Sequence, residues 1–434
     1  MDQNRLEKDN VLRIGGVSST ELAKICGTPL YVYDEALIED KLKSYQTHFK
    51  SNLFDTEIIY ASKAFSCGAM LRLLKNNGFS LDVVSGGELY LAESEGFPME
   101  RVYFHGNNKI SEELEMALNY GCKTIVVDHL MECDRLISLA ERKKKEVHAI
   151  IRINPGVTAH THKYIITGDM DSKFGVSIQS EETILGMIIR MKASKYVIFD
   201  GFHAHIGSQI FDLRAYDTLI ERMMKLFKKL QEMHKIEIGC LNLGGGFGVR
   251  YTDQDQPKTV KDVCENLIRK CESEMAEKGI RLKKLMIEPG RSVIAEAGCT
   301  LYKVGDLKET PNRSYLFVDG GMTDNIRVAL YEAKYDCDLA NKMDQVRNRK
   351  YTIAGKCCES GDILIENAML PEVKANDLIV VYGTGAYGYS MASNYNRMNK
   401  PAVVFAKDGK AHIVIKRESY SDQLRFETDE EVFA

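Results

Sequence analysis

The residues whose types suggest chemistry stand at the ends of short apolar runs. The first is Lys63, which follows the apolar stretch 58–61 in the segment "EIIYASKAFSCGAM" (57–70). No carboxylate is close to it in sequence. A buried ammonium group is costly unless it loses its proton or its nitrogen is bonded. Lys63 therefore either points into water or serves as a reactive amine.

Two further segments offer groups that bind anions. The glycines of "LGGGFG" (243–248) lack a Cβ atom, so their backbone N–H groups can approach a phosphate closely, although the segment can also be a plain tight turn. The segment "EPGR" (288–291) places a carboxylate at a strand end and an arginine three residues later. These two groups either form a local ion pair, or they face a cationic ring nitrogen and a substrate carboxylate, respectively.

Histidine and cysteine pairs raise other possibilities. The segment "HAHIGSQ" (203–209) has two histidines two residues apart, which suits a metal, so a barrel metallohydrolase is a rival hypothesis. His160 and His162 repeat this spacing in a polar stretch. A metal site requires further ligands at other strand ends, and no third set stands out, so we expect none. In "CCES" (357–360) two thiols precede a carboxylate, although most cysteines of cytosolic proteins are small buried apolar residues.

The elements that must position these residues alternate between strands and helices. Helix-like segments with apolar residues three and four positions apart separate eight apolar runs, and the first five runs start 21 to 24 residues apart. The runs are 57–63, 80–85, 101–106, 124–128, 148–154, 199–207, 240–246 and 285–291. This period predicts a (β/α)8 barrel, in which catalytic residues gather at the C-terminal ends of the strands. A doubly wound sheet is the alternative.

The pattern changes from about residue 299, where β-rich runs follow one another without long helices. Asp408-Gly409 lies between two of these runs and predicts a hairpin turn. We expect an α/β protein with a barrel over 36–298 and a mostly antiparallel β-sandwich or β-barrel domain. The segment "PLYVYD" (29–34) can join that domain, so we assign 1–35 and 299–434 to it. Residues 336–350 resemble a polar surface excursion.

Composition limits the class of protein. The 434 residues are 44% apolar and 28% charged with a formal net charge of −4, so nothing attracts the chain to nucleic acid or anionic lipid. No signal peptide core and no membrane-spanning apolar run is present in the sequence. The eleven cysteines include no C-x-x-C pair, which indicates reduced thiols and a cytoplasmic location.

Taken together, these segments resemble the fold-type III pyridoxal-phosphate-dependent decarboxylases. The resemblance runs from "TPLYVYD" (28–34) to "GAYGYSMASNYN" (385–396), and "YASKA" is similar to the family's cofactor-lysine motif. The other motifs follow in family order: "FHGNNKISEEL", "INPGVTAHTHKYIITG", "DSKFG", "HIGSQ", "GGGFG", "EPGR", "VDGGMTDNIRVALY" and "CES". The segments "HTHKYIITG" and "CES" favour members that convert meso-2,6-diaminopimelate to L-lysine. The alternative is a decarboxylase of ornithine, arginine or carboxynorspermidine.

The resemblance implies a role for each matching residue. Lys63 would carry pyridoxal 5'-phosphate covalently, Glu288 would face the pyridine nitrogen, and His205 would stack on the ring. Phosphate would be bound by Ser208, Gly244, Gly245, Gly246, the backbone of Pro289, Gly290 and Arg291, and Tyr387. Cys358 would deliver the proton that replaces carbon dioxide.

The substrate would be an amino acid held at its far end. Arg291, Arg327, Tyr331 and Tyr387 would contact the substrate, with the two arginines on its distal carboxylate and Glu359 near its distal ammonium. A substrate without that carboxylate would leave buried guanidinium groups unpaired.

The resemblance also implies a homodimer, in which "CES" and "GAY" complete the active site of the neighbouring subunit. The chain departs from the family pattern twice, with Lys356 and Val328 where proline is usual. An amino-acid racemase is disfavoured because racemases of this fold pair the ring nitrogen with arginine rather than with a carboxylate. A non-catalytic relative should lack a proton donor at Cys358, and the sequence does not decide between Cys357 and Cys358 as that donor.

Overall fold

The computed structural model describes residues 10–157 and 172–433. The chain divides into two compact units. One comprises Glu39–Val249 and Gln256–Val293, and the other comprises Met1–Ile38, Arg250–Asp255 and Ile294–Ala434. His160, His162 and the segment "HTHKYIITG" lie outside the described residues, so the structure does not test the predictions made for them.

The first unit is a closed barrel of parallel strands. Its strands are β4 (Asp55–Ala61), β5 (Ser80–Val83), β6 (Val102–Phe104), β7 (Thr124–Val127), β8 (Val147–Asn154), β10 (Val197–Ala204), β11 (Cys240–Asn242) and β12 (Lys284–Ile287). They neighbour one another in the order β10-β11-β12-β4-β5-β6-β7-β8, and the pairing of β10 with β8 closes the cylinder. The short strand β9 (Val176–Ser177) is added beside β8. The barrel prediction is therefore confirmed over the doubly wound alternative.

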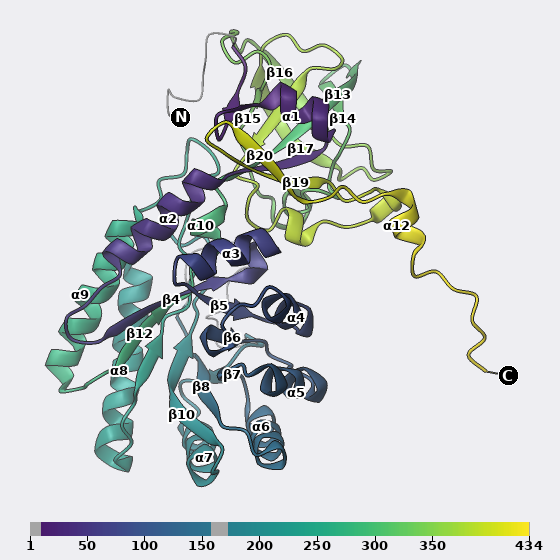
Figure 1. Ribbon diagram of the computed structural model, residues 1–434. Coiled ribbons are helices and arrows are strands. Elements are labelled where there is room, and N and C mark those ends of the chain that lie inside the picture. Colours follow the sequence, from purple (N-terminus) through teal and green to yellow (C-terminus); the bar gives the residue numbers. More distant parts are fainter. Residues whose placement is uncertain (1–9, 158–171, 434) are drawn as a thin grey trace. The chain divides into compact units, whose positions relative to one another are not determined.

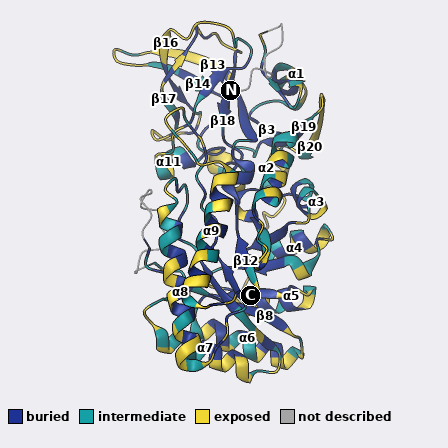
Figure 2. Cartoon of the chain, turned by 90° about the vertical axis from the view of Figure 1, so that its left-hand side faces the viewer, coloured by how far each residue is buried: buried dark blue, intermediate teal, exposed yellow. Residues whose placement is uncertain are grey.

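Helices cover the outside of the barrel (Figure 1). They are α2 (Glu35–His48), α3 (Gly68–Asn76), α4 (Gly86–Ser94), α5 (Ser111–Tyr120), α6 (Leu130–Lys143), α7 (Glu181–Ala193), α8 (Arg214–His234) and α9 (Val260–Lys278). The short α10 (Arg291–Ile294) follows β12 and is buried. In α8 the buried residues Tyr216, Leu219, Ile220, Met223 and Phe227 recur three and four positions apart, so one stripe of the helix faces the barrel. Figure 2 shows the result, with buried strands inside and helices exposed on their outer faces.

The barrel interior is layered. Ile59, Tyr103, Val126, Ile150, Cys240 and Met286 form an apolar cluster contributed by six different strands. Towards the C-terminal ends of the strands the interior becomes polar, with Asp82, His105, His203, Asn242 and Glu288 all buried. The apolar layer thus forms a floor beneath a group of ionisable side chains.

The second unit contains a nine-stranded, mostly antiparallel sheet. Its strands are β3 (Leu30–Asp34), β13 (Gly298–Glu309), β14 (Ser314–Val318), β15 (Cys337–Leu339), β16 (Arg349–Ala354), β17 (Ile363–Leu370), β18 (Leu378–Tyr382), β19 (Ala402–Lys407) and β20 (Lys410–Ile415). Only β14–β16 and β3–β19 pair parallel among the described strands of this sheet. The unit also holds the two-residue strands β1 (Arg13–Ile14) and β2 (Val17–Ser18), with α1 (Ser19–Cys26), α11 (Arg327–Tyr331) and α12 (Tyr420–Leu424).

Two local predictions about this unit are confirmed and one is wrong. The segment 29–34 does join the sheet, because β3 pairs with β13 and β19. Asp408 and Gly409 adopt φ values of 51° and 73° and connect β19 to β20, as expected for a tight hairpin. The segment 336–350 is not wholly a surface excursion, since Cys337–Leu339 forms the strand β15, which pairs with β18 and is buried at all three residues.

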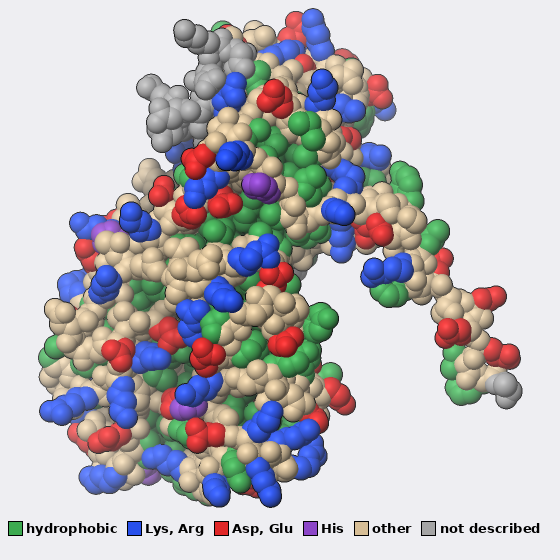
Figure 3. Space-filling model, viewed as in Figure 1, with side chains coloured by type: hydrophobic (Ala, Val, Ile, Leu, Met, Phe, Trp, Pro, Cys, Tyr) green, Lys and Arg blue, Asp and Glu red, His purple; other side chains and the backbone are tan. Residues whose placement is uncertain are grey.

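The surface has no single dominant sign of charge in the view of Figure 3, where basic and acidic side chains are interspersed over the barrel helices. All eleven cysteines are free thiols. Among the described helices, none combines the length and the hydropathy that crossing a membrane requires.

Candidate active site

Lys63 follows β4 on a single 3-10 turn, Ser62–Ala64. Lys63 is exposed while its neighbours Ser62 and Ala64 are buried, so it is not a buried ammonium, and exposure was one of the two possibilities that the sequence left open. A lysine that the barrel does bury is Lys109, whose Nζ lies 2.7 Å from Oε1 of Glu132. Lys63 thus differs from Lys109 in its exposure.

The small residues around Lys63 have a packing reason. A Cβ atom on Gly290 would lie 2.9 Å from the Cβ of Ala61 and 3.1 Å from the Cβ of Ala64. The N–H of Ala61 also donates to the carbonyl of Pro289 at 3.3 Å. The turn after β4 therefore packs tightly against the "EPGR" turn after β12, and this packing brings Lys63 and Glu288 to the same end of the barrel.

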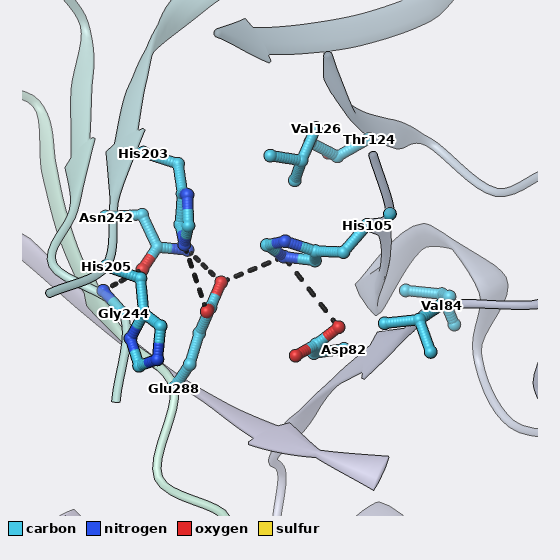
Figure 4. Close-up of polar contacts among 12 residues, drawn as sticks. Asp82, Val84, His105, Thr124, Val126, His203, His205, Asn242, Gly244 and Glu288 are labelled. Carbon is cyan, nitrogen blue, oxygen red and sulfur yellow. Dashed lines mark hydrogen bonds and ion pairs between the residues drawn. The ribbon is translucent and has the colours of Figure 1, made fainter. Parts of the chain in front are cut away.

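Glu288 is a buried carboxylate surrounded by donors (Figure 4). Nδ2 of Asn242 donates to its Oε1 at 2.6 Å, and Nε2 of His203 lies 3.1 Å from its Oε2. Nε2 of His105 lies 2.9 Å from Oε1. Burial acts to raise the pKa of Glu288, but His105 and His203 outweigh it and hold the pKa well below its usual range. The side chain is therefore an ionised carboxylate, and the local ion pair with Arg291 that "EPGR" left open is not among its contacts.

A second carboxylate lies near the same nitrogen of His105. Oδ1 of Asp82 is 3.9 Å from Nε2 of His105, the atom that also contacts Glu288 (Figure 4). Burial raises the pKa of Asp82, the charge of Glu288 adds to this rise, and His105 and Lys63 oppose it. The two carboxylates thus differ in their environment, since Glu288 accepts several hydrogen bonds and Asp82 does not.

His205 lies immediately after β10 and is a neutral imidazole. Burial lowers its pKa well below the ordinary value, and the nearby positive charges of Lys63 and Arg152 lower it further. The N–H of Gly245 donates to Nδ1 of His205 at 3.3 Å, which places the proton of the neutral ring on Nε2. An uncharged, oriented imidazole is suited to stack on an aromatic ligand. His203, two residues earlier, is inside the strand and points to Glu288 instead.

The glycines of the turn after β11 are required by close backbone packing. A Cβ on Gly245 would lie 2.0 Å from the carbonyl oxygen of Glu288, and one on Gly246 would lie 2.1 Å from that of Gly207. Gly244 and Gly246 also have positive φ values of 68° and 97°. The N–H of Gly244 donates to Oδ1 of Asn242 at 2.9 Å, so this group and the N–H of Gly245 already have partners within the barrel.

Arg291 and Ser208 come together beside this turn. Nε and Nη2 of Arg291 donate to Oγ of Ser208 at 3.3 Å and 2.8 Å. Arg291 begins α10 and is buried, and Ser208 follows β10. The contact joins Ser208, which we assigned to the cofactor phosphate, to Arg291, which we assigned mainly to the substrate carboxylate.

His105, His203 and Glu288 also satisfy the distance criterion for a metal site, with one ligand atom each within 4.8 Å of the others. They are the only such group among residues 10–157 and 172–433. The rival metallohydrolase hypothesis thus gains a third ligand that the sequence did not suggest. However, the positive charges of Arg152 and Lys63 act on the same cluster, and both oxygens of Glu288 already accept hydrogen bonds. This environment favours a hydrogen-bonded carboxylate over a cation site.

Four residues of this cluster escaped the sequence analysis: Asp82, His105, Arg152 and Asn242. Arg152 on β8 lies with its guanidinium carbon 4.5 Å from the ring centroid of Phe174, in the "DSKFG" segment. Each of the four is a polar residue inside or directly after an apolar strand, at or near its C-terminal end. A polar residue at the C-terminal end of an apolar run was therefore a signal in the sequence that could have identified these four residues. Ser85 and Asn154, which also stand near strand ends, instead accept hydrogen bonds from the N–H groups of Glu88 and Gly156.

The remaining predicted site residues belong to the sheet unit. Arg327 and Tyr331 lie at the two ends of α11, and the guanidinium carbon of Arg327 is 6.0 Å from the Tyr331 ring centroid. Cys358 and Glu359 lie on the loop between β16 and β17, where both are exposed. Tyr387 follows β18, is partly buried and has a φ of 60°, which is unusual for a residue with a side chain.

The two departures from the family pattern are accommodated locally. The N–H of Lys356 donates to the carbonyl of Gly320 at 3.0 Å, a bond that proline could not make. Val328 lies in the first turn of α11, where a backbone N–H needs no partner within the helix, so valine and proline both fit there. The helix that carries Arg327 therefore forms without the proline.

The buried histidine His203 predicts a loss of stability in acid. Burial lowers its pKa to about 4, against about 6.5 in an unfolded chain. Between these values the unfolded state binds a proton that the folded state does not, so stability falls as the pH drops from 6.5 to 4, by about 3 kcal/mol from this group. In urea unfolding measured at several pH values, a His203→Gln variant should show a clearly smaller decrease. Equal pH dependence in the two proteins would contradict this assignment.

Comparison with known proteins agrees with this geometry. Residues 35–295 match the family described as "Pyridoxal-dependent decarboxylase, pyridoxal binding domain". The diaminopimelate decarboxylase of Bacillus subtilis is 47% identical to this chain over 425 residues, which cover 98% of the chain and 97% of that protein.

Solved structures give the same result. The chain is similar to the crystal structure of diaminopimelate decarboxylase from M. jannaschii, with a TM-score of 0.91, 34% identity and 98% of each chain covered. It is also similar to the Helicobacter pylori diaminopimelate decarboxylase complexed with L-lysine, with a TM-score of 0.85, 32% identity, and coverage of 94% of this chain and 98% of that one. On the barrel, the site at its strand ends and these full-length similarities, the chain belongs to the diaminopimelate decarboxylase family of pyridoxal-dependent decarboxylases.

Proposed function

We propose that this protein decarboxylates meso-2,6-diaminopimelate to L-lysine and carbon dioxide, the last step of lysine synthesis, with pyridoxal 5'-phosphate as its cofactor. The observation that carries the proposal is the ionised Glu288, held by Asn242 and His203 at the end of the barrel that also presents the exposed amine of Lys63. The full-length similarity to named diaminopimelate decarboxylases supports the choice of substrate.

The side chains at the barrel mouth fit this cofactor by their chemistry. Lys63 offers a primary amine to an aldehyde, Glu288 offers a fixed negative charge to a ring N–H, and His205 offers a neutral ring face. When bound, pyridoxal phosphate supplies a ring that accepts the electrons left behind as carbon dioxide departs. Glu288 would keep a negative charge beside the ring nitrogen and so favour its protonated form.

The phosphate would be held mainly by side chains and by the last glycine of the turn. The N–H groups of Gly244 and Gly245 already donate to Asn242 and His205, so they contribute less than the sequence suggested. Gly246, the hydroxyl of Ser208, the adjacent Arg291 and the N-terminal turn of α10 remain suited to an anion. Tyr387 stays part of this proposal as a residue of the sheet unit.

Substrate selection would rest on the distal carboxylate. Arg327 is buried, yet it forms no ion pair with any carboxylate of residues 10–157 or 172–433. A carboxylate on the substrate would supply that missing negative charge, together with a contact from Arg291. Ornithine, arginine and carboxynorspermidine offer no equivalent group in the same place, which disfavours the alternative substrates. Glu359, which is exposed on its loop, would meet the distal ammonium.

Cys358 is the better proton donor of the two adjacent cysteines. Cys357 is buried, its pKa is raised to about 11 by burial and by the carboxylate of Asp362, and its N–H is held by Asp362 at 2.7 Å. Cys358 is exposed, and its backbone N–H donates to Oδ1 of Asn396 at 2.7 Å. An accessible thiol can deliver a proton to a ligand.

We also propose a cytoplasmic homodimer in which each sheet unit completes the barrel site of its partner. Mixing two inactive variants tests this arrangement. Lys63→Ala and Cys358→Ala subunits, unfolded and refolded together, should regain about a quarter of wild-type activity, because half of the dimers then hold one intact site. Each variant refolded alone is the control. No recovery in a verified mixed dimer would place both residues in one subunit's site and reject the composite arrangement.

A product assay tests the function itself. Purified protein with added pyridoxal phosphate is incubated separately with meso-diaminopimelate, ornithine, arginine and lysine, and the amines formed are identified. Lysine from the first reaction alone is the expected result. Putrescine or agmatine would retain the cofactor chemistry and change the substrate. No product and no visible absorption from bound cofactor would reject the proposal and favour the metal-site hypothesis for His105, His203 and Glu288.

A further inference from the structure

Arg327 lies in an unusual environment for a buried arginine. Its side chain is only 6% exposed, and it has no carboxylate partner among the described residues. A buried charge without a counter-ion is costly, so groups that stabilise the guanidinium without neutralising it should be found nearby. In this unit, aromatic side chains surround it.

Two tyrosines make the closest of these contacts. Nη1 of Arg327 donates to the hydroxyl of Tyr335 at 2.5 Å, and the guanidinium carbon lies 5.0 Å from the ring centroid of Tyr251. Tyr251 and Tyr335 are themselves buried and pack edge to face, with ring centroids 5.3 Å apart at 81°. The carbonyl of Tyr251 accepts the N–H of Asp336 at 3.3 Å, which fixes the segment 250–255 to the strand region that carries Tyr335. The pair is a rigid wall on one side of Arg327.

The chemistry of this wall preserves the charge of Arg327. A phenol is neutral at pH 7, so it offers an oxygen and a negative ring face while leaving the net positive charge in place. An aspartate or glutamate at either position would neutralise the guanidinium and compete with an incoming carboxylate. The hydrogen bond to Tyr335 occupies one N–H of Nη1, and a planar guanidinium has further donors for a bidentate carboxylate.

We infer that Tyr251 and Tyr335 are positioning residues that hold the Arg327 guanidinium, fully charged, for the distal carboxylate of the substrate. This inference rests on the proposed function, because it assigns the specificity of that reaction to residues that do not themselves react. Arg327 binds a part of the substrate that is unchanged by decarboxylation. Misplacing it should therefore weaken substrate and transition state alike, raising KM and leaving kcat unchanged.

The test is a kinetic comparison on the full-length enzyme loaded with pyridoxal phosphate. A Tyr335→Phe variant should raise KM for meso-diaminopimelate about tenfold, with kcat within about twofold of wild type. The inhibition constant of L-lysine, which keeps one carboxylate, should rise in parallel. That of 1,5-diaminopentane, which has no carboxylate, should not change. Tyr251→Leu, which removes the ring face, should give a smaller rise of a few fold.

Controls separate positioning from a general structural effect. Tyr351→Phe removes a buried hydroxyl of the same unit that accepts the N–H of Val373 at 3.3 Å, and it should leave every constant unchanged. In an Arg327→Ala background, Tyr335→Phe should add nothing, because its effect acts through Arg327. An unchanged KM in Tyr335→Phe, an equal rise for 1,5-diaminopentane, or an additive effect in the double variant would overturn the inference. A wild-type enzyme that makes no lysine would instead reject the proposed function.

Discussion

A Lys63→Ala variant should lose lysine formation by about a thousandfold or more and should no longer retain pyridoxal phosphate through gel filtration. The reason is that the primary amine is the group that would bind the cofactor covalently. Because the side chain is exposed, removing it creates no cavity, and the variant should fold normally. Activity and the visible absorption of the bound cofactor are measured together, with the thermal midpoint as the folding check.

Two companion variants identify which property of Lys63 matters. Lys63→Arg keeps the positive charge that helps lower the pKa of His205, but its guanidinium is not a nucleophile at neutral pH, so it should be as inactive as the alanine variant. Lys75→Ala removes another exposed lysine, on α3, whose Nζ donates to the carbonyl of Gly96 at 2.7 Å, and it should be fully active. Substantial activity in Lys63→Arg would show that charge alone is required and would contradict covalent attachment.

A Glu288→Gln variant should lower kcat by about a hundredfold to a thousandfold while still binding the cofactor. Glutamine has the same shape and can still accept the hydrogen bond of Asn242, but it has no negative charge to stabilise a protonated ring nitrogen. The pKa of Glu288 is held well below its usual range by His105 and His203. In the wild type, kcat should therefore show no titration of this carboxylate at any pH above 5.

The control for Glu288→Gln is another buried carboxylate of the barrel unit. Glu274 on α9 pairs with Lys270 at 2.7 Å and with Lys278 at 2.5 Å, so Glu274→Gln also removes a buried charge but lies outside the site cluster. It should leave kcat unchanged. If Glu288→Gln retains wild-type kcat, the carboxylate has no electronic role and the assignment is wrong. If both variants lose activity with lowered thermal midpoints, the loss reflects folding rather than chemistry.

The local pattern of the sequence was sufficient for much of the fold. Apolar runs about as long as a strand, separated by amphipathic helices at a regular period, predicted the eight barrel strands in order. The run 148–154 ends where β8 ends, but the other seven were drawn one to four residues too far, at Lys63 rather than Ala61 and at Gly246 rather than Asn242, for example. The reason is that the polar and glycine residues of the site follow the strands directly, and their chemistry says nothing about where backbone pairing stops.

The candidate site residues that directly follow a strand could be identified from the same local pattern of the sequence. Lys63, His205, the glycines 244–246 and Glu288 each stand out against a run of apolar neighbours, and parallel strands necessarily present these positions at one end of a barrel. Their motifs also resemble a known family. The sequence left the exposure of Lys63 open, because burial depends on what covers the barrel mouth and not on the apolar run that precedes it.

The sequence by itself determined that a barrel with an amine, a carboxylate and a glycine turn at its strand ends would form, followed by a sheet unit. Tertiary structure alone decided which groups set the charge of those residues. Asp82, His105 and Asn242 meet Glu288 only because strands far apart in the chain close into one cylinder. Tyr251 likewise reaches Arg327 across more than seventy residues of sequence. Hydrogen bonds and pKa shifts depend on distances of a few ångströms between such residues, and no local pattern encodes those distances.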